Sequence, residues 1–465
     1  MINEDTICAI ATGQGGAIGI IRISGPEAIT ITNKIFCPAD KGSKPLTERK
    51  AYSIAYGHIK NENDEILDDV LVSLFRAPHS YTGEDCTEIS CHGSAYILQQ
   101  IMQVLVNNGC RTAEPGEYTR RAFLNGKMDL SQAEAVADLI ASTSSATHKL
   151  AMNQMRGAFS HGLSELRDKL LHLTSLMELE LDFSDHEELE FADRTQLNDI
   201  AQQIENVVSQ LVSSFSLGNA IKRGVPVAII GETNAGKSTL LNTLVGEDRA
   251  IVSDIHGTTR DIIEDVVNID GIMFRFIDTA GIRETSDTIE RLGIDRTFKK
   301  IEQANIVIWV VDPTDKTGKT ELLSNQIFPL CKEKQLIIAF NKTDITGDAS
   351  LPDLNNPPTH IYSISISAKH GTNIDKLKNI LTNAAGIPTI ASGDVIVTNT
   401  RHYEALKRTL TTIRRVRESL TTNLPADLIS QDLRECIHNI AEIVGGEITS
   451  EETLQNIFKN FCVGK

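Results

Sequence analysis

The chain has 465 residues, of which 41% are hydrophobic and 23% charged, with a formal net charge of −17. This length and composition predict a globular protein of roughly three domains. The negative charge argues against a protein that coats nucleic acid non-specifically, because neutralising phosphates requires clustered cations. The N-terminal MINEDTICAI lacks a cationic segment, and no run reaches the roughly 18 apolar residues of a membrane helix, so we expect neither a secretory signal nor a membrane span.

The eight cysteines follow no paired spacing, which favours reduced thiols in the cytoplasm over a disulfide framework. Cys86, Cys91 and His92 lie close enough in sequence to suggest zinc. No second pair of ligands accompanies them, so small buried side chains are the preferred interpretation of the two cysteines.

Residues 1–118 are predicted to form a mixed α+β domain. Short β-rich runs (ICAIAT, GIIRIS, YSIAYGHI, VLVSLF and TEISCH) are separated by glycine, proline and Asn/Asp turns. We expect a helix beginning near Ser94 to interrupt these strands.

From residue 119 the hydrophobic pattern becomes helical. Apolar residues recur at steps of three and four, which places each set on one face of a helix. The sets are Phe159, Leu163, Leu166, Leu170, Leu173 and Met177; Leu197, Ile200, Ile204, Val207 and Leu211; Leu406, Leu410, Ile413, Val416 and Leu420; and Leu433, Ile437, Ile440 and Val444.

Between these helical stretches, residues 219–384 alternate apolar strands with helices, which is typical of a parallel α/β sheet. The predicted architecture is multidomain: an α+β N-terminal domain, and a P-loop α/β domain inserted into an all-α domain. The expected boundaries are 1–118, 119–217, 218–385 and 386–465. The acidic stretch 178–191 could bind a cation, but a solvated helix end is the preferred interpretation.

A phosphate-binding loop is predicted where an apolar strand is followed by GETNAGKST and an amphipathic helix. Backbone N–H groups and the helix N-terminus can hold phosphates, Lys237 can reach the β/γ oxygens, and the Ser238 hydroxyl can bind Mg²⁺. The nucleotide-binding residues expected here are Asn234, Ala235, Gly236, Lys237, Ser238 and Thr239.

Three later motifs indicate that the bound nucleotide is GTP. Asp278, Thr279, Ala280 and Gly281 end one strand, where Asp278 can hold the Mg²⁺ shell. Asn341, Lys342, Thr343 and Asp344 end another, and Asp344 can accept two hydrogen bonds from the guanine edge, which adenine cannot offer. Ser367, Ala368 and Lys369 follow against the base. Four ordered motifs at strand ends predict a GTPase, but Ile282 stands where Ras-type enzymes have the glutamine that positions water.

The whole chain resembles the tRNA-modification GTPase MnmE (TrmE) family. The resemblance rests on IGIIRISGP, SYTGED, PGEYTRRAFLNGKMDLSQAEAVADLI, GETNAGKSTLLN, DIHGTTRD, DTAGIRETSDTIERLGI and FCVGK. It implies a homodimer with a tetrahydrofolate-binding N-terminal domain. It also implies a heterotetramer with the FAD-dependent partner MnmG, which places an aminomethyl or carboxymethylaminomethyl group on C5 of the wobble uridine.

The resemblance also implies how GTP is hydrolysed without the glutamine. A K⁺ ion would offset charge on the β–γ bridge when two GTPase domains meet. Its ligands would be Asn234, Ser253, Ile255 and Thr258, with Thr259 as a second Mg²⁺ ligand and Glu290 positioning water. The GTP contacts implied in this segment are Ser253, Asp254, Ile255, His256, Gly257, Thr258 and Thr259. Thr233 departs from the proline that the family commonly has before the asparagine, so we expect a less stiff phosphate loop.

The folate site implied by the resemblance consists of Arg22, Glu88, Lys127 and Lys465. We expect Glu88 to accept paired donors from the 2-amino-4-oxo pterin ring, and Arg22 or the lysines to meet the glutamyl carboxylates. The one-carbon carrier would be 5-formyl- or 5,10-methylene-tetrahydrofolate.

Cys462 lies three residues before the last residue, where a lipid anchor, a buried thiol or an active-site thiol could be imagined. Gly464 and Lys465 do not fit a prenylation signal. The resemblance favours a catalytic thiol near folate and the target base, and a buried cysteine remains the alternative. A reactive thiolate at this position would need nearby cations to lower its pKa.

A basic segment follows residue 400, in which Arg401, Arg408 and Arg415 recur every seven residues and share one face. Lys407, Arg414 and Arg417 accompany them. This face could contact the tRNA anticodon region, and a solvated helix surface is an equal alternative.

Two other functions are weighed against this one. A regulatory GTPase switch in ribosome assembly would account for residues 219–384 but leaves SYTGED, FLNGK and the last four residues without a purpose. A folate-dependent one-carbon transferase with regulatory GTP binding is the second alternative.

Overall fold

The computed structural model describes residues 5–13, 15–40, 42–182, 194–247, 265–277, 300–314, 319–346, 361–388, 394–422, 424–446, 454, 457–459, 461 and 464. The chain divides into two compact units. One comprises residues 1–140, 154–175 and 433–465, and the other comprises residues 141–153 and 176–432. Across the described ranges, no helix is long and apolar enough to cross a membrane.

The first unit contains a seven-stranded sheet in the order β3-β4-β5-β6-β2-β1-β7, antiparallel except for the parallel pair β1–β7. Side chains alternate along its strands: Val70, Val72 and Leu74 are buried, while Leu71 between them is exposed. The strands are β1 Ile7–Ile10, β2 Ile18–Ser24, β3 Phe36–Pro38, β4 Ser53–Lys60, β5 Ile66–Phe75, β6 Cys86–His92 and β7 Arg111–Thr112.

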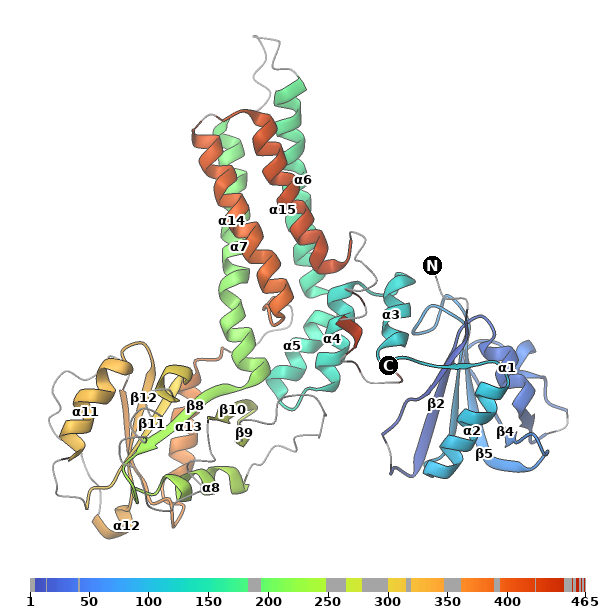
Figure 1. Ribbon diagram of the computed structural model, residues 1–465, viewed down its shortest axis with the longest axis horizontal. Coiled ribbons are helices and arrows are strands. Elements are labelled where there is room, and N and C mark those ends of the chain that lie inside the picture. The colour runs from blue at the N-terminus through green and yellow to red at the C-terminus, as the bar shows by residue number, and fades with distance from the viewer. Residues whose placement is uncertain are drawn as a thin grey trace. The chain divides into compact units, whose positions relative to one another are not determined.

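Two helices, α1 (Ala28–Ile35) and α2 (Ala95–Asn107), bury their apolar faces on one side of this sheet (Figure 1). The other side carries the cross-strand pair Arg22 and Glu88. The helix expected near Ser94 is present as α2, for which Ser94 is the N-cap residue. The short helix α1 was not predicted, because its β-branched residues favour strands.

Helices α3 (Glu117–Leu124) and α4 (Leu130–Ile140) follow the sheet, and Leu130 and Ala133 share a small apolar core with Leu454 and Phe458. The following helices are α5 Ser145–Met155 and α6 Ala158–Asp182; α15 is Ala426–Val444. The whole predicted stripe of α6, from Phe159 to Met177, is buried. In α15, Leu433 and Ile440 are buried as expected, but Ile437 and Val444 are only half-buried, and Cys436 and Ile443 are buried instead.

The second unit contains a six-stranded sheet in the order β13-β12-β11-β8-β10-β9. All pairs are parallel except β9–β10, so the expected parallel α/β sheet carries one antiparallel edge strand. The strands are β8 Val225–Gly231, β9 Asp265–Ile269, β10 Ile272–Phe276, β11 Ile306–Val311, β12 Gln335–Phe340 and β13 Ile361–Ser365.

Apolar side chains cover both faces of this sheet, which is why its central strands read as continuous hydrophobic runs. Helices α8 (Lys237–Glu247) and α13 (Ile374–Ala385) pack on one face, and α11 (Lys319–Leu330) packs on the other. The short helix α12 (Thr343–Thr346) follows β12. The ends of β8, β11 and β12 therefore meet at one edge of the sheet, where ligands of open α/β sheets bind.

Two long helices of the second unit, α7 (Arg194–Arg223) and α14 (Thr400–Thr421), lie side by side (Figure 1). The predicted α14 stripe is buried, but in the first half of α7 the buried residues are Leu197, Ala201, Ile204 and Val208. The buried face is thus rotated by about one position from the predicted one, since Ile200, Val207 and Leu211 are only half-buried.

The chain returns to α7 through a close backbone contact at Gly218. A Cβ there would lie 2.1 Å from the Val397 carbonyl oxygen, and the Val397 N–H donates to the Ser214 hydroxyl at 3.0 Å. A side chain at position 218 would push this segment away.

Candidate functional site

The loop between β8 and α8 has the backbone of a phosphate cradle. Asn234 and Gly236 both have positive φ, 65° and 98°, which turns successive backbone groups toward one point. A Cβ on Gly236 would lie 2.1 Å from the Asn341 side-chain nitrogen, so this position requires glycine. Helix α8 begins directly afterwards at Lys237, and its N-terminus favours anions.

The Lys237 side chain folds back over this loop. Its ammonium donates to the carbonyl oxygens of Gly231 at 2.8 Å and Glu232 at 2.6 Å. Burial lowers the pKa of Lys237, and the nearby Lys300 ammonium lowers it further. Both effects disfavour an uncompensated positive charge, so an incoming phosphate would relieve them. The Lys237 ammonium and the N-terminus of α8 together fit the phosphates of a nucleoside triphosphate.

Asn341 joins the cradle to the two loops beyond β12 and β13. Its Nδ2 donates to the Ala235 carbonyl at 2.8 Å, and its Oδ1 accepts from the Ala368 N–H at 2.9 Å. The Thr243 hydroxyl of α8 donates to the Ala368 carbonyl at 2.9 Å. Three segments far apart in sequence are thereby fixed around one site.

The carboxylate of Asp344 is oriented by its neighbours. The Ser367 hydroxyl donates to Asp344 Oδ1 at 2.7 Å, and His370 Nε2 lies 3.7 Å from Oδ2. The Ser367 hydrogen bond lowers the pKa of Asp344, with smaller contributions from His370 and Lys369. An ionised acceptor at this edge matches the donors of a guanine base.

Asp312, at the end of β11, contributes to the site and was missed from the sequence. It forms an ion pair with Lys342 and accepts from Thr314. Lys342 has a positive φ of 66°, and this ion pair fixes the direction of its side chain. Asp312 could have been found only by knowing that β11 and β12 are neighbours in the sheet. The order of parallel strands along the sequence does not establish this.

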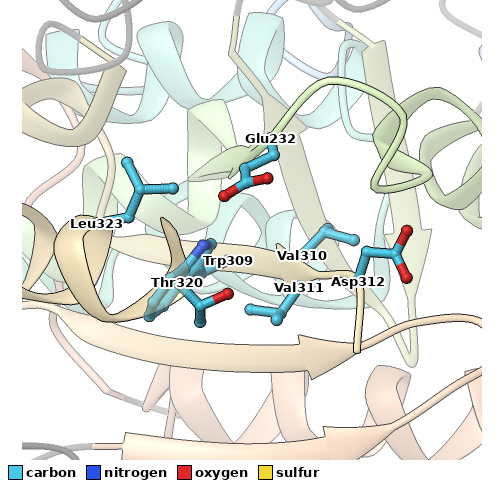
Figure 2. A pocket seen from close by; sticks show the side chains of 7 residues that line it. All are labelled: Glu232, Trp309, Val310, Val311, Asp312, Thr320 and Leu323. Carbon is cyan, nitrogen blue, oxygen red and sulfur yellow. The ribbon is translucent and has the colours of Figure 1, made fainter. Parts of the chain in front are cut away.

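A small pocket is lined by Glu232 of the phosphate loop and by Asp312, the ion-pair partner of Lys342 (Figure 2). The remaining lining residues are Trp309, Val310, Val311, Thr320 and Leu323.

The structure brings together the predicted residues at 234–239, 341–344 and 367–369. Several other candidates lie outside the described residues. They are Ser253, Asp254, Ile255, His256, Gly257, Thr258, Thr259, Asp278, Thr279, Ala280, Gly281, Glu290, Cys462 and Lys465, together with most of the acidic stretch 178–191.

A second candidate site lies on the open face of the N-terminal sheet. Arg22 and Glu88 face each other across β2 and β6, where Arg22 Nε donates to Glu88 Oε1 at 2.9 Å and Nη2 forms an ion pair with the same oxygen at 2.8 Å. The Arg22 guanidinium lies 5.5 Å from the ring centroid of Tyr81 and 5.7 Å from that of Tyr118. Both charged side chains remain partly exposed, at 19% and 24%.

Lys127 contacts the loop that carries Tyr81, since its ammonium donates to the Pro78 carbonyl at 2.9 Å. Gly464 comes closer to the pair: its carbonyl accepts from Arg22 Nη1 at 3.4 Å. A residue near the end of the chain therefore reaches the Arg22 site, while Cys462 itself lies outside the described residues.

The two cysteines considered for zinc are buried in the N-terminal sheet. Burial raises the pKa of Cys86 to about 12 and that of Cys91 to about 11, so both are neutral thiols at neutral pH. Only 3% of Cys86 and 5% of Cys91 is exposed, which agrees with their interpretation as small buried side chains.

The basic face of α14 is partly neutralised by acidic neighbours. Arg415 makes two hydrogen bonds to Asp432, at 2.9 and 2.6 Å, and Arg414 and Arg417 both pair with Glu205. The face therefore offers less positive potential than its sequence alone predicts.

A sheet whose strand ends present a phosphate loop, Asp344 and the Ser367–Lys369 loop defines a P-loop guanine nucleotide-binding protein. Two family descriptions match the chain: "GTP-binding protein TrmE N-terminus" over residues 6–127 and "MnmE helical domain" over residues 130–462. The chain therefore belongs to the MnmE (TrmE) family.

Full-length relatives support this assignment. Proteins named "tRNA modification GTPase MnmE" from Bacteroides thetaiotaomicron and Bacteroides fragilis are each 62% identical, and the alignments cover 100% of this chain and 100% of each relative. The protein of that name from Flavobacterium johnsoniae is 50% identical over the same full coverage.

Proposed function

We propose that the chain is a GTP hydrolase that takes part in tRNA modification. The observation that carries the nucleotide assignment is the set of contacts in which Asn341 joins the phosphate loop to the Ala368 loop beside an oriented Asp344. The full-length relatives bear the name of a tRNA modification GTPase, which supports the second half of the proposal. With MnmG, the product would be an aminomethyl or carboxymethylaminomethyl group on C5 of the wobble uridine, carried from tetrahydrofolate.

In this proposal each segment of the cradle has one task. Residues 234–239 hold the phosphates, Asp344 reads guanine, and residues 367–369 close over the base. Ser238 and Thr259 would bind Mg²⁺. Asn234, Ser253, Ile255 and Thr258 would bind K⁺, which supplies positive charge beside the β–γ bridge, and Glu290 would position water.

We also propose that Arg22, Glu88, Lys127 and Lys465 bind tetrahydrofolate, and that the domains divide at 1–118, 119–217, 218–385 and 386–465. The pairing of Arg22 with Glu88 on an open sheet face supports the folate site. Ile54, Tyr56 and Leu71 are exposed on the same face, by 64%, 54% and 46%, which supports a homodimer. Seven free cysteines among the described residues fit a cytoplasmic protein.

The first test compares GTP turnover in potassium and sodium salts, for the wild-type protein and for Glu290→Ala. We expect a rate that depends strongly on potassium and a large loss of rate in the variant. Equal rates in both salts would overturn the potassium mechanism and leave the GTPase assignment standing.

The second test measures wobble-uridine modification of tRNA in cells that lack the protein. Loss of the C5 group that returns with the wild-type gene would support tRNA modification. If the C5 group is absent from the tRNA of wild-type cells, or fully present in cells that lack the protein, the ribosome-assembly or one-carbon-transferase alternatives would be favoured instead.

A further inference from the structure

Gly464 occupies a position that only glycine fits. It is buried, its φ is +97°, and an added Cβ would lie 2.5 Å from the Ile10 carbonyl oxygen and 3.0 Å from the Ala11 Cα. The obstructing atoms belong to the backbone of β1 and the residue after it, so they cannot move aside as a side chain would.

A second glycine makes room for the same segment of chain. Gly116, before α3, has a φ of +67°, and a Cβ there would lie 2.8 Å from Phe461 Cβ and 2.9 Å from the Phe458 carbonyl oxygen. Phe458 is buried with Leu130 and Ala133, and its ring packs 5.0 Å from that of Phe461. The described residues between 454 and 464 are therefore docked at two points.

Arg22 links this docked segment to the candidate folate site. It donates to Glu88 through Nε and to the Gly464 carbonyl through Nη1, and its Nη2 forms an ion pair with Glu88. The Tyr118 hydroxyl donates to the Arg22 carbonyl at 2.7 Å, and the rings of Tyr81 and Tyr118 lie beside the guanidinium. Arg22 is therefore held in contact with both the Glu88 carboxylate and the Gly464 carbonyl.

We propose that Gly464 is a positioning residue that couples folate binding, through Arg22, to docking of the C-terminal segment, by which we mean the described residues 454, 457–459, 461 and 464. This inference rests on the proposed folate function. A pterin that donates to Glu88 competes with Arg22 for that carboxylate. The released guanidinium donors then bind the Gly464 carbonyl or a carboxylate of the ligand. Coupling between two binding events is reciprocal, so folate stabilises the docked segment and the docked segment strengthens folate binding.

The experiment uses the full chain with Gly464→Ala, and with Gly446→Ala as the matched control. Gly446 has no atom closer than 3.8 Å to an added Cβ, so alanine fits there. Calorimetry measures the Kd of 5-formyltetrahydrofolate, and hydrogen exchange follows residues 454–464 with and without it. We expect Gly464→Ala to raise the Kd by about tenfold or more, to speed exchange in the segment, and to abolish its protection by folate.

Phe461→Ala provides a second variant that keeps Gly464 and removes one docking contact, and we expect changes in the same direction. Glu88→Gln separates the inference from the function on which it rests: it should lose folate binding and leave the segment docked. If wild type and Glu88→Gln bind folate alike, the folate function is wrong. If only Glu88→Gln is impaired, while Gly464→Ala and Phe461→Ala bind folate and exchange like wild type, the coupling is wrong.

Discussion

Ser367 donates a 2.7 Å hydrogen bond to one oxygen of the Asp344 carboxylate, which fixes the plane of that carboxylate. The same bond lowers the pKa of Asp344, so the group is fully ionised at neutral pH. A carboxylate held in this way presents acceptors only, and guanine is the base that offers two adjacent donors. This supports our proposal that Asp344 recognises the guanine base and that Ser367 orients the Asp344 carboxylate.

Asp344→Asn should exchange the specificity of the site. An amide can donate to the 2-oxo group of xanthine but repels the 2-amino group of guanine, so we expect GTP affinity to fall by about a hundredfold or more and XTP to become the preferred ligand. Competition with a fluorescent GTP analogue measures both. Asp375→Asn, in the exposed first turn of α13, is the control and should bind as wild type does. GTP binding unchanged in Asp344→Asn would contradict the assignment of this carboxylate.

Asn341→Ala should destabilise the second unit as well as weaken nucleotide binding. The substitution leaves the Ala235 carbonyl and the Ala368 N–H without their partner at a position that is 4% exposed. Each unsatisfied buried group costs about 1–3 kcal/mol. We expect a lower midpoint in thermal unfolding and a higher Kd for GDP. Asn379→Ala, on the exposed face of α13, is the control. Equal midpoints of thermal unfolding for the two variants would refute the bridging role.

The N-terminal unit should lose stability in acid through its buried ion pairs. Glu117 is fully buried and accepts from Arg111 and Arg121. Burial alone would raise the pKa of Glu117, but the hydrogen bonds from Arg111, from the Glu114 N–H and from Arg121 together outweigh it and lower the pKa below the ordinary value of 4.5. The stabilisation is therefore fully present above pH 4.5 and is lost as the pH falls through the folded-state pKa.

Arg111→Met tests this pH dependence. We expect the variant to lose about 1.5–3 kcal/mol of unfolding free energy at neutral pH, and the difference from wild type to shrink as the pH falls below 4.5. Urea unfolding followed by circular dichroism at a series of pH values measures both. Asp64→Asn, which removes an 83% exposed partner of Lys60, is the control and should change little. A constant difference at all pH values would contradict the assigned role.

Two kinds of feature could be predicted from the sequence. They are helices and strands whose apolar residues recur with a regular period, and site residues whose motif lies between a recognisable strand and a helix. The α6 stripe, α2 and the order of strands and phosphate loop in the second unit follow from such signals. Contacts that depend on which strands become neighbours could not be predicted. Asp312 reaches Lys342 because β11 pairs with β12. The family resemblance grouped Arg22 with Glu88, but their direct contact follows from the register in which β2 pairs with β6. The placement of Gly464 beside Arg22 likewise depends on packing between the two ends of the chain.

The basic face of α14 yields a prediction that the structure makes sharper. Replacing Arg408 and Arg415 together with glutamate should weaken tRNA binding and reduce its dependence on salt, because each phosphate contact contributes to the salt slope. Arg415 already makes two hydrogen bonds to Asp432, so part of any loss could come from a new repulsion between two carboxylates.

Asp432→Asn separates these two effects. It removes the competing carboxylate and keeps Arg415, so we expect tRNA binding to stay equal or become tighter. Combining it with the two glutamate substitutions removes one of the repelling charges and should restore thermal stability without restoring tRNA affinity. Filter binding at several salt concentrations, with unfolding midpoints alongside, measures both properties. If the triple variant regains tRNA affinity together with its stability, the arginines support the helix and the tRNA is bound elsewhere.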